Sequence, residues 1–237
     1  MKMPNKNNPD LAIDVSGLCF SWHSQDPLLE IDALQIKRGE RIFIEGPSGS
    51  GKSTLLSLIA GVVTPQKGTI TINDQLVSAL NGADRDRFRA DHIGFIYQMF
   101  NLIPYLSVVE NVTLPCRFSL RRREKAAARS SSFEAEAMRL LKSLGLDSAS
   151  VIKKPANELS VGQQQRVAAA RALIGAPEII IADEPTSSLD TDYRKAFIRL
   201  LFQECDPKET TLIFVSHDTI LANLFDQTIR LADINKI

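Results

Sequence analysis

The segment GPSGSGKST has the residue types and the spacing of a phosphate-binding loop. It matches the pattern G-x-x-x-x-G-K-[ST], and it lies between a predicted strand, Arg41–Ile44, and a predicted helix, Lys52–Ala60. Glycines at this spacing let backbone N–H groups turn inward toward phosphate oxygens. We expect every residue of the segment to bind nucleotide: Gly46, Pro47, Ser48, Gly49, Ser50, Gly51, Lys52, Ser53 and Thr54.

Two of these side chains have predicted chemical roles. Lys52 supplies a point charge to the β- and γ-phosphates, and the Ser53 hydroxyl is placed to bind Mg²⁺. The segment therefore predicts a nucleoside triphosphate site that uses magnesium.

A second segment, EIIIADEP, supplies the acids that such a site needs. Ile179–Ile181 predict a buried strand, and Asp183 follows at its carboxyl end, where ligands of α/β sheets bind. We expect Asp183 to hold Mg²⁺ through water and Glu184 to polarise the attacking water. Two adjacent acids alone would more simply indicate a solvated strand end, and it is the phosphate-binding loop that favours the catalytic interpretation.

His217 and Gln98 each follow another predicted strand. His217 comes after the apolar run of TLIFVSHD and could contact the γ-phosphate and the water, although a lone histidine there is more often structural. Gln98 follows Ile93–Tyr97 and could contact Mg²⁺ and the same water.

The segment ELSVGQQQRVAAARAL predicts a helix whose first turn can bind an anion. Ser160, Gly162 and Gln163 stand at its start, where free N–H groups and the helix dipole favour negative charge. The chain thus has a second candidate phosphate site, separate in sequence from the first.

These segments require a sheet and helices to position them. Short β-branched runs alternate with helical patterns, which indicates a largely parallel sheet with crossover helices. The predicted strands are Ile42–Ile44, Thr69–Ile72, Ile93–Tyr97, Ile179–Ala182 and Thr211–Val215. The predicted helices are Lys52–Ala60, Ser132–Leu144, Val161–Ile174 and Asp192–Glu204.

The composition limits the possible partners. Among 237 residues, 28 basic and 28 acidic side chains cancel, which argues against a nucleic-acid binder that depends on a broad basic field.

No apolar run is long enough to span a bilayer, and the polar residues 1–10 predict a flexible tail and not a signal peptide. The three cysteines have no paired spacing and indicate reduced thiols. We interpret the basic run Arg121–Lys125 as a solvated helix face or turn, with phosphate or lipid contact as the alternative.

Together these motifs resemble the ATP-binding subunits of ABC transporters, over nearly the whole chain. In family order they are GPSGSGKST (Walker A), Gln98 (Q-loop), LSVGQ (signature), IIIADEP (Walker B), SSLD (D-loop) and His217 (H-switch). The resemblance implies an α/β fold: a P-loop NTPase (RecA-like) mixed-sheet core with an inserted α-helical subdomain and an N-terminal antiparallel β region. On this basis the ATPase domain spans 11–237, with the core at about 11–97 and 160–237 and the helical subdomain at about 98–159.

The family resemblance also implies why there are two phosphate sites. In ABC ATPases two copies pair head to tail around two ATP molecules, so Ser160, Gly162 and Gln163 would bind the ATP held by the partner's Lys52. Asp190 of the D-loop would contact the opposing subunit.

This sequence departs from the family pattern in two places. Val161 stands where many members have glycine, although its N–H remains available at the helix start. In CFSWHS, Trp22 occupies the position of the aromatic residue that stacks on adenine. Phe20 is the competing candidate, and a tryptophan buried in the core is the alternative.

Within the family the chain looks most like the MacB/LolD group, whose ATPases serve permeases of the FtsX/MacB type. This implies an ATP-driven, Mg²⁺-dependent homodimer on the cytoplasmic face of the inner membrane, with no nucleic-acid partner. The apolar loop after Gln98, which includes Met99, Phe100 and Tyr105, would receive the permease's coupling helix or pack within the helical subdomain. The alternatives are a soluble ABC ATPase acting on nucleic acid or ribosomes, an importer ATPase, and a regulatory module without hydrolysis.

Overall fold

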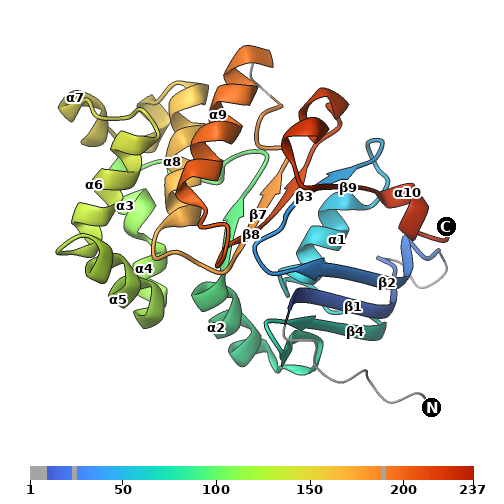
Figure 1. Ribbon diagram of the computed structural model, residues 1–237. Coiled ribbons are helices and arrows are strands. Elements are labelled where there is room, and N and C mark those ends of the chain that lie inside the picture. Colours follow the sequence, from blue (N-terminus) through green and yellow to red (C-terminus); the bar gives the residue numbers. More distant parts are fainter. Residues whose placement is uncertain (1–9, 23–25, 188–190) are drawn as a thin grey trace.

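The computed structural model describes residues 10–22, 26–187 and 191–237, and these residues form two sheets and a group of helices (Figure 1). The antiparallel sheet has the strand order β2-β1-β4-β5. Its strands are β1 (Leu11–Phe20), β2 (Leu29–Lys37), β4 (Lys67–Ile72) and β5 (Gln75–Leu76). The other sheet has the order β6-β7-β8-β3-β9. Its strands are β3 (Arg41–Glu45), β6 (Ile93–Ile96), β7 (Ile179–Asp183), β8 (Thr211–Val215) and β9 (Gln227–Arg230).

Every strand pair in the second sheet is parallel, so the antiparallel strands that the family resemblance implied form a sheet of their own. Alternate side chains of the parallel strands enter different cores. Phe43 and Phe214 pack with helices on one face, whereas Ile42 and Ile213 pack with α1 and the antiparallel sheet on the other. Because both faces are covered, the inner strands β7 and β8 are almost entirely buried, which is why they read as continuous apolar runs. The edge strand β9 is mostly exposed and polar.

The helices connect the strands and cover both faces. The longer ones are α1 (Lys52–Ile59), α2 (Gly82–His92), α5 (Leu120–Arg129), α6 (Phe133–Ser143), α8 (Val161–Leu173) and α9 (Thr191–Glu204). The shorter ones are α3 (Val108–Thr113), α4 (Pro115–Phe118), α7 (Ala149–Ile152) and α10 (Leu231–Ile234), with 3-10 turns η1 (Val77–Ala79), η2 (Ala156–Glu158) and η3 (Thr219–Leu224). Each helix and strand predicted from the sequence is present, with ends shifted by at most two residues.

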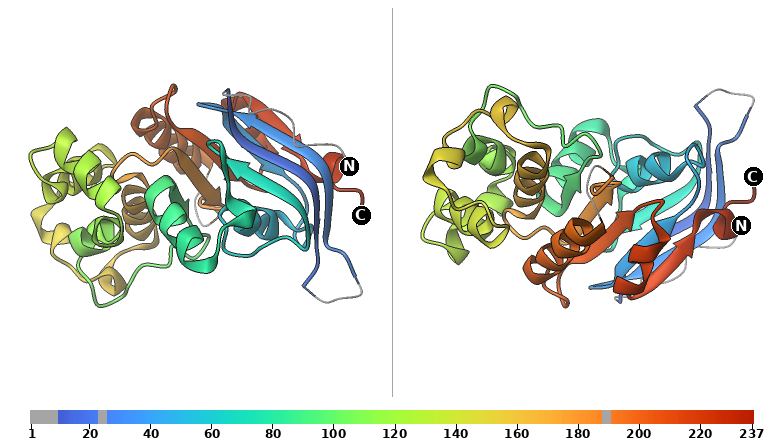
Figure 2. Two further views of the ribbon diagram at one scale, coloured as in Figure 1. Left: turned by 90° about the horizontal axis from the view of Figure 1, so that it is seen from below. Right: turned by 90° about the horizontal axis from the view of Figure 1, so that it is seen from above.

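Helices α3 to α7 gather on one side of the molecule, away from the antiparallel sheet (Figure 2). Helix α8 packs against α3 and α6 of this group and also against strand β6 of the parallel sheet. It therefore joins the helical region to the core, and the division of the chain at about residue 160 stays a prediction.

The basic run Arg121–Lys125 lies at the start of α5, and its interpretation as a solvated face is wrong for Arg122. Arg122 is buried, and its guanidinium donates to the carbonyls of Ala172 (2.6 Å) and Ile174 (2.8 Å) at the end of α8. A cation there satisfies carbonyls that have no partner within the helix.

Among the described residues, no helix is both long and apolar enough to cross a membrane. Cys19, Cys116 and Cys205 are all free thiols.

Candidate functional site

The phosphate-binding loop joins β3 to α1 and depends on glycine for its shape. Gly49 (φ 81°) and Gly51 (φ 99°) both have left-handed backbone conformations that other residues rarely adopt. A Cβ atom at Gly51 would also lie 2.9 Å from Cδ2 of Leu29, so a side chain here would require the buried Leu29 to shift. The loop therefore turns directly into the first turn of α1, whose N–H groups face outward.

Lys52, the first residue of α1, points back over this loop. Only 6% of the side chain is exposed, and its Nζ donates to the carbonyls of Gly46 (2.7 Å) and Pro47 (2.8 Å). The hydroxyl of Ser50 is buried beside the loop and has no hydrogen-bond partner among the described residues. A buried cation and an unpaired hydroxyl at the start of a helix fit a bound phosphate group.

Asp183 ends strand β7 next to Ser53. Burial raises the pKa of its carboxyl group, while a hydrogen bond with Ser53 and the charge of Lys52 oppose that rise. The described residues contain no group of three or more His, Cys, Asp or Glu that could hold a metal ion. A carboxylate and a hydroxyl side by side fit Mg²⁺, because this ion usually takes its other ligands from water and phosphate oxygens.

Glu184 lies between Lys52 and His217. Its Oε1 is 4.0 Å from Nζ of Lys52, and its Oε2 is 3.1 Å from Nδ1 of His217. The residue has φ 44°, and its N–H donates to the carbonyl of Val215 on the neighbouring strand β8. This unusual backbone conformation, fixed by the adjacent strand, is of the kind found at functional sites. A carboxylate held by a cation and a histidine can accept a proton from water.

The loop after β6 brings Gln98 to the same edge of the sheet, because the strands are parallel and β6 pairs with β7. The Gln98 side chain is exposed, and the chain turns sharply after it through Phe100 (φ 59°) and Asn101 (φ 49°). Five predicted site residues thus lie at or after the carboxyl ends of parallel strands: Lys52, Gln98, Asp183, Glu184 and His217.

The start of α8 is not part of this group. Ser160 caps the helix: its hydroxyl accepts from the N–H of Gln163 (3.4 Å), and the Gln163 side chain accepts from the N–H of Ser160 (3.0 Å). Gly162 follows with open space where a Cβ would lie, and Val161 is exposed. Helix α8 lies with the helical group and α1 lies near the antiparallel sheet, so the two candidate phosphate sites are separate within one chain (Figure 1).

The two aromatic candidates for stacking on a nucleobase differ in exposure. Trp22 is 58% exposed, and its Nε1 donates to the hydroxyl of Thr54 in α1 (3.3 Å). Phe20 is buried, and its ring meets that of Trp22 edge to face with centroids 5.0 Å apart. Trp22 therefore presents an open ring beside the loop, and it is not a core residue. Asp190 lies outside the described residues.

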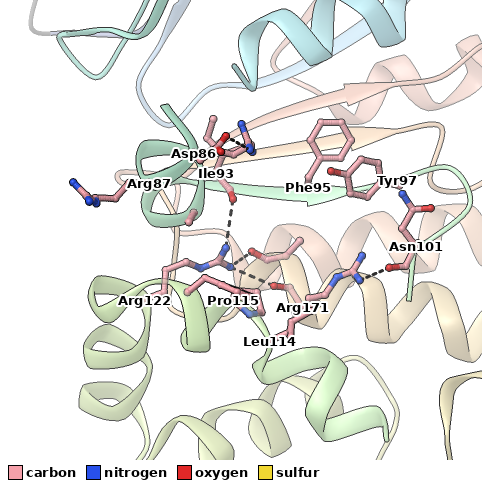
Figure 3. A pocket seen from close by; sticks show the side chains of 14 residues that line it. Asp86, Arg87, Ile93, Phe95, Tyr97, Asn101, Leu114, Pro115, Arg122 and Arg171 are labelled. Atoms are coloured by element: carbon pink, nitrogen blue, oxygen red, sulfur yellow. Dashed lines mark hydrogen bonds and ion pairs between the residues drawn. The ribbon is translucent and has the colours of Figure 1, made fainter. Parts of the chain in front are cut away.

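Sequence reasoning missed a cavity of about 580 Å³ that opens beside the loop after Gln98 (Figure 3). Its lining comes from α2, β6, that loop, α4, α5 and α8, and includes Arg87, Tyr97, Asn101, Arg122 and Arg171. Phe118, which lines the cavity, is exposed. The exposed apolar side chains also include Met99 and Tyr105 in the loop after Gln98 and Leu120 at the start of α5. In the sequence, the apolar loop after Gln98 was the signal for such a surface. Helix α2 has no apolar stripe, so its sequence gave no sign that it lines this cavity.

Comparison with known proteins places these features in a family. The family model described as ABC transporter matches residues 29–187. The lipoprotein-releasing system ATP-binding protein LolD of Syntrophotalea carbinolica is 38% identical over 93% of this chain and 95% of its own length.

Solved structures agree with this relationship. The dimeric structure of MJ0796, a bacterial ABC transporter cassette, is 34% identical and superposes with a TM-score of 0.77 over 92% of this chain and 93% of its own. A dimeric post-hydrolysis state of MJ0796, bound to ADP and phosphate, gives a TM-score of 0.78 at the same identity and coverage. An ABC transporter ATP-binding protein of the same designation from Methanocaldococcus jannaschii is 40% identical over 84% of this chain and 83% of its own length.

Proposed function

The chain belongs to the ABC transporter family, and from this premise we propose that it is the ATP-hydrolysing subunit of a transporter that works as a head-to-tail pair. The single observation that carries the proposal is the separation of two phosphate-type sites on one chain. Lys52 and the acids lie at the edge of the parallel sheet, whereas Ser160 and Gly162 open a helix in another part of the molecule. A second copy brings the two together.

Each residue of the first site has a role in this proposal. The loop N–H groups and Lys52 bind the β- and γ-phosphates, and Ser53, Asp183 and Gln98 are the side chains that would hold Mg²⁺. When bound, Mg²⁺ neutralises charge on the phosphate oxygens. Glu184 accepts the proton of the attacking water, and His217 holds the Glu184 carboxylate in place, as their 3.1 Å contact supports.

Gly162 supports the trans arrangement independently. Its backbone does not require glycine, since its φ is not left-handed, and no atom of the described residues lies within 4 Å of the place of its Cβ. A glycine without an internal reason fits a site where something from outside approaches the backbone closely. The N–H groups at the start of α8 and the Ser160 hydroxyl would then bind the γ-phosphate of ATP held by the partner copy, and Asp190 would contact that copy.

We assign the permease contact to the cavity near Gln98. The cavity and the exposed side chains of Met99, Tyr105 and Phe118 form a surface that can receive a short helix of a transmembrane partner. LolD is the ATP-binding protein of a lipoprotein-releasing system, and similarity to it supports service to a transporter. We extend this to a permease of the FtsX/MacB type and to a role in export or in mechanical transmission across the envelope. The protein would then sit on the cytoplasmic face of the inner membrane, with the segment 98–159 as the helical subdomain that carries this surface.

The substitution Ser160→Arg tests the head-to-tail pair. The bulky cation should abolish ATP hydrolysis and leave ATP binding at Lys52 unchanged, because the two residues lie on separate elements. Ser148→Arg is the matched control, since Ser148 is also an exposed serine that precedes a helix. Hydrolysis at the wild-type rate by Ser160→Arg would contradict the proposal.

Mixing Ser160→Arg with Lys52→Ala sharpens this test. Neither variant should hydrolyse ATP alone. Each mixed pair, however, has one site with both substitutions and one site with neither, so the mixture should recover part of the wild-type rate. No recovery at any mixing ratio, with mixed pairs shown to form, would refute the assignment of Ser160 to the partner's site.

A further inference from the structure

Arg171, near the end of α8, makes a contact that none of the roles above includes. Its side chain is largely buried, and its guanidinium donates to the carbonyl of Phe100 (2.6 Å). It also donates to the carbonyl of Asn101 (2.6 Å), as Figure 3 shows. These carbonyls belong to the loop that begins at Gln98. The same helix is capped at its start by Ser160. One helix therefore has the second candidate phosphate site at its start and contacts this loop near its end.

The contact suits arginine in particular. A planar guanidinium presents donors in a fixed fork, and here they reach two successive carbonyls. Phe100 and Asn101 both have left-handed backbone conformations, which are costly for residues other than glycine and persist only where the surroundings hold them. Burial lowers the pKa of Arg171, and the neighbouring Tyr97 opposes this shift. The hydrogen bonds of the guanidinium go to the carbonyl oxygens of Phe100 and Asn101.

The remainder of the loop is fastened to the segment that leads into α8. The N–H of Asn157 donates to the carbonyl of Pro104 (3.3 Å), and the N–H of Ala156 donates to that of Leu106 (3.0 Å). Asn111 holds the middle of the loop, because its side chain accepts from the N–H of Ile103 (2.8 Å) and donates to the carbonyl of the same residue. The first part of the loop is therefore hydrogen-bonded to α8, and its last part is hydrogen-bonded to the segment that precedes α8.

Arg122 fixes the end of α8 against the core. Its guanidinium donates to the carbonyls of Ala172 in α8 and of Ile174, the residue that follows α8, and it lies 3.4 Å from the carbonyl of Ile93 at the start of β6. Helix α8, strand β6 and the loop after it are thus connected by two buried arginines, and Arg171 is the one that touches the loop.

We propose that Arg171 is a positioning residue for ATP hydrolysis, which holds Gln98 in register with the signature helix by fixing the backbone at Phe100 and Asn101. The proposal rests on the proposed function for its assignment of roles to Gln98 and Ser160. Arg171 touches neither nucleotide nor metal, and it acts only through the loop. Its loss should leave the Lys52 site intact and displace Gln98.

The test measures steady-state hydrolysis by Arg171→Met and Arg171→Lys. A displacement of about 1 Å in a catalytic group can cost roughly a hundredfold in rate, so kcat of Arg171→Met should fall about tenfold to a hundredfold, with KM and ATP affinity within about twofold of wild type. Arg171→Lys keeps the charge but loses the fork, and its kcat should be intermediate. Arg166→Met is the matched control, since Arg166 lies on the same helix and, within the part of the chain that the structure describes, donates to the carbonyl of Gly145 and not to the loop.

Two further measurements separate positioning from a purely structural role. Amide hydrogen exchange should rise in a peptide covering residues 97–103 of Arg171→Met and stay unchanged in the peptide of the phosphate-binding loop. The double variant Gln98→Ala/Arg171→Met should lose no more kcat than Gln98→Ala alone, because both changes remove one function.

Several results would overturn the proposal. A folded Arg171→Met with wild-type kcat would do so, as would losses that add in the double variant. If Arg171→Met does not fold, the proposal would be refuted by Arg171→Lys with both a wild-type kcat and wild-type amide hydrogen exchange in the peptide 97–103. Wild-type kcat in Gln98→Ala would also refute it, while the mixing experiment with Ser160→Arg would still decide the proposed function separately.

Discussion

Replacing Trp22 by alanine should weaken nucleotide binding without unfolding the protein. The side chain is 58% exposed, and among the described residues it hydrogen-bonds to Thr54 and meets the edge of the Phe20 ring, so its loss creates no buried cavity. Stacking of a base on an aromatic ring is worth about 1–3 kcal/mol. At about 1.4 kcal/mol per decade, this predicts a roughly tenfold to hundredfold increase in the Kd of ATP or ADP.

The assay is direct because Trp22 is the only tryptophan in the chain. Emission excited at long wavelength reports this side chain alone, and a stacked purine should quench or shift it saturably as nucleotide is added. Calorimetry then gives the Kd of the variants that have no tryptophan.

Matched variants make the result interpretable. Trp22→Tyr should bind nearly as well as wild type, since a phenol ring stacks in the same way, and GTP should bind nearly as well as ATP, because stacking tolerates any base. Phe20→Leu should lower the melting temperature while leaving the Kd close to wild type, because Phe20 is buried. Unchanged emission together with a normal Kd in Trp22→Ala would refute the assignment of Trp22 to the base.

Other substitutions test the remaining parts of the site and the fold. Glu184→Gln should bind ATP normally but lose most of its kcat, because an amide cannot accept the proton of water; near-normal turnover would exclude Glu184 as the base. Gly162→Ala should raise the melting temperature slightly, since alanine is favoured over glycine in a helix by about 1 kcal/mol, yet it should reduce kcat; wild-type kcat would count against a close approach to this backbone. Burial raises the pKa of Glu178, but hydrogen bonds from His92, Lys125 and Arg121 lower it well below its usual range. Glu178→Gln should therefore lower the free energy of unfolding by about 1–3 kcal/mol at pH 7. This deficit, measured by urea unfolding, should shrink as the pH falls below about 4.3, where the unfolded-state carboxylate takes up a proton; a deficit independent of pH would refute the reasoning.

The first site could be predicted from the sequence because its chemistry fixes both residue type and spacing. A loop that surrounds phosphate needs glycine at Gly49 and Gly51, and a lysine must follow at once to start the helix. Asp183 and Glu184 were identifiable for another reason: they follow an apolar strand, and the carboxyl ends of parallel strands share one edge. The local sequence therefore carries enough information to place these groups together.

The connections between α8 and its surroundings were not predictable in the same way. Arg122 lies in a run of charges that resembles a solvated face, and only the fold brings it to the carbonyls at the end of α8, 50 positions later in the case of Ala172. Arg171 sits in an alanine-rich helix, and its partners Phe100 and Asn101 lie about 70 residues upstream. Contacts between side chains and distant backbone leave no periodicity in sequence.

Helix α2 shows a related limit. Its buried surface is small, and none of its residues is fully buried, so the hydrophobic pattern that reveals other helices is absent. The helix instead depends on Asn81, whose side chain caps it by accepting from the N–H of Asp84, and on Arg85, which donates to the carbonyls of Gly61 and Leu80. Only the first of these is local enough to be recognised as a helix start.

The adjacent residues Val161 and Gly162 indicate how the two copies would meet. At Gly162 the backbone does not need the conformational freedom of glycine, and no atom of the described residues occupies the place of a Cβ, which is consistent with the proposed approach of a partner copy. At Val161 the side chain is exposed, so a bulky group is accepted at this position of the helix start. Successive side chains on a helix point about 100° apart, so these two positions face different directions. The partner's nucleotide should therefore approach α8 from the side of Gly162 and the Ser160 hydroxyl, leaving Val161 at the margin of the contact.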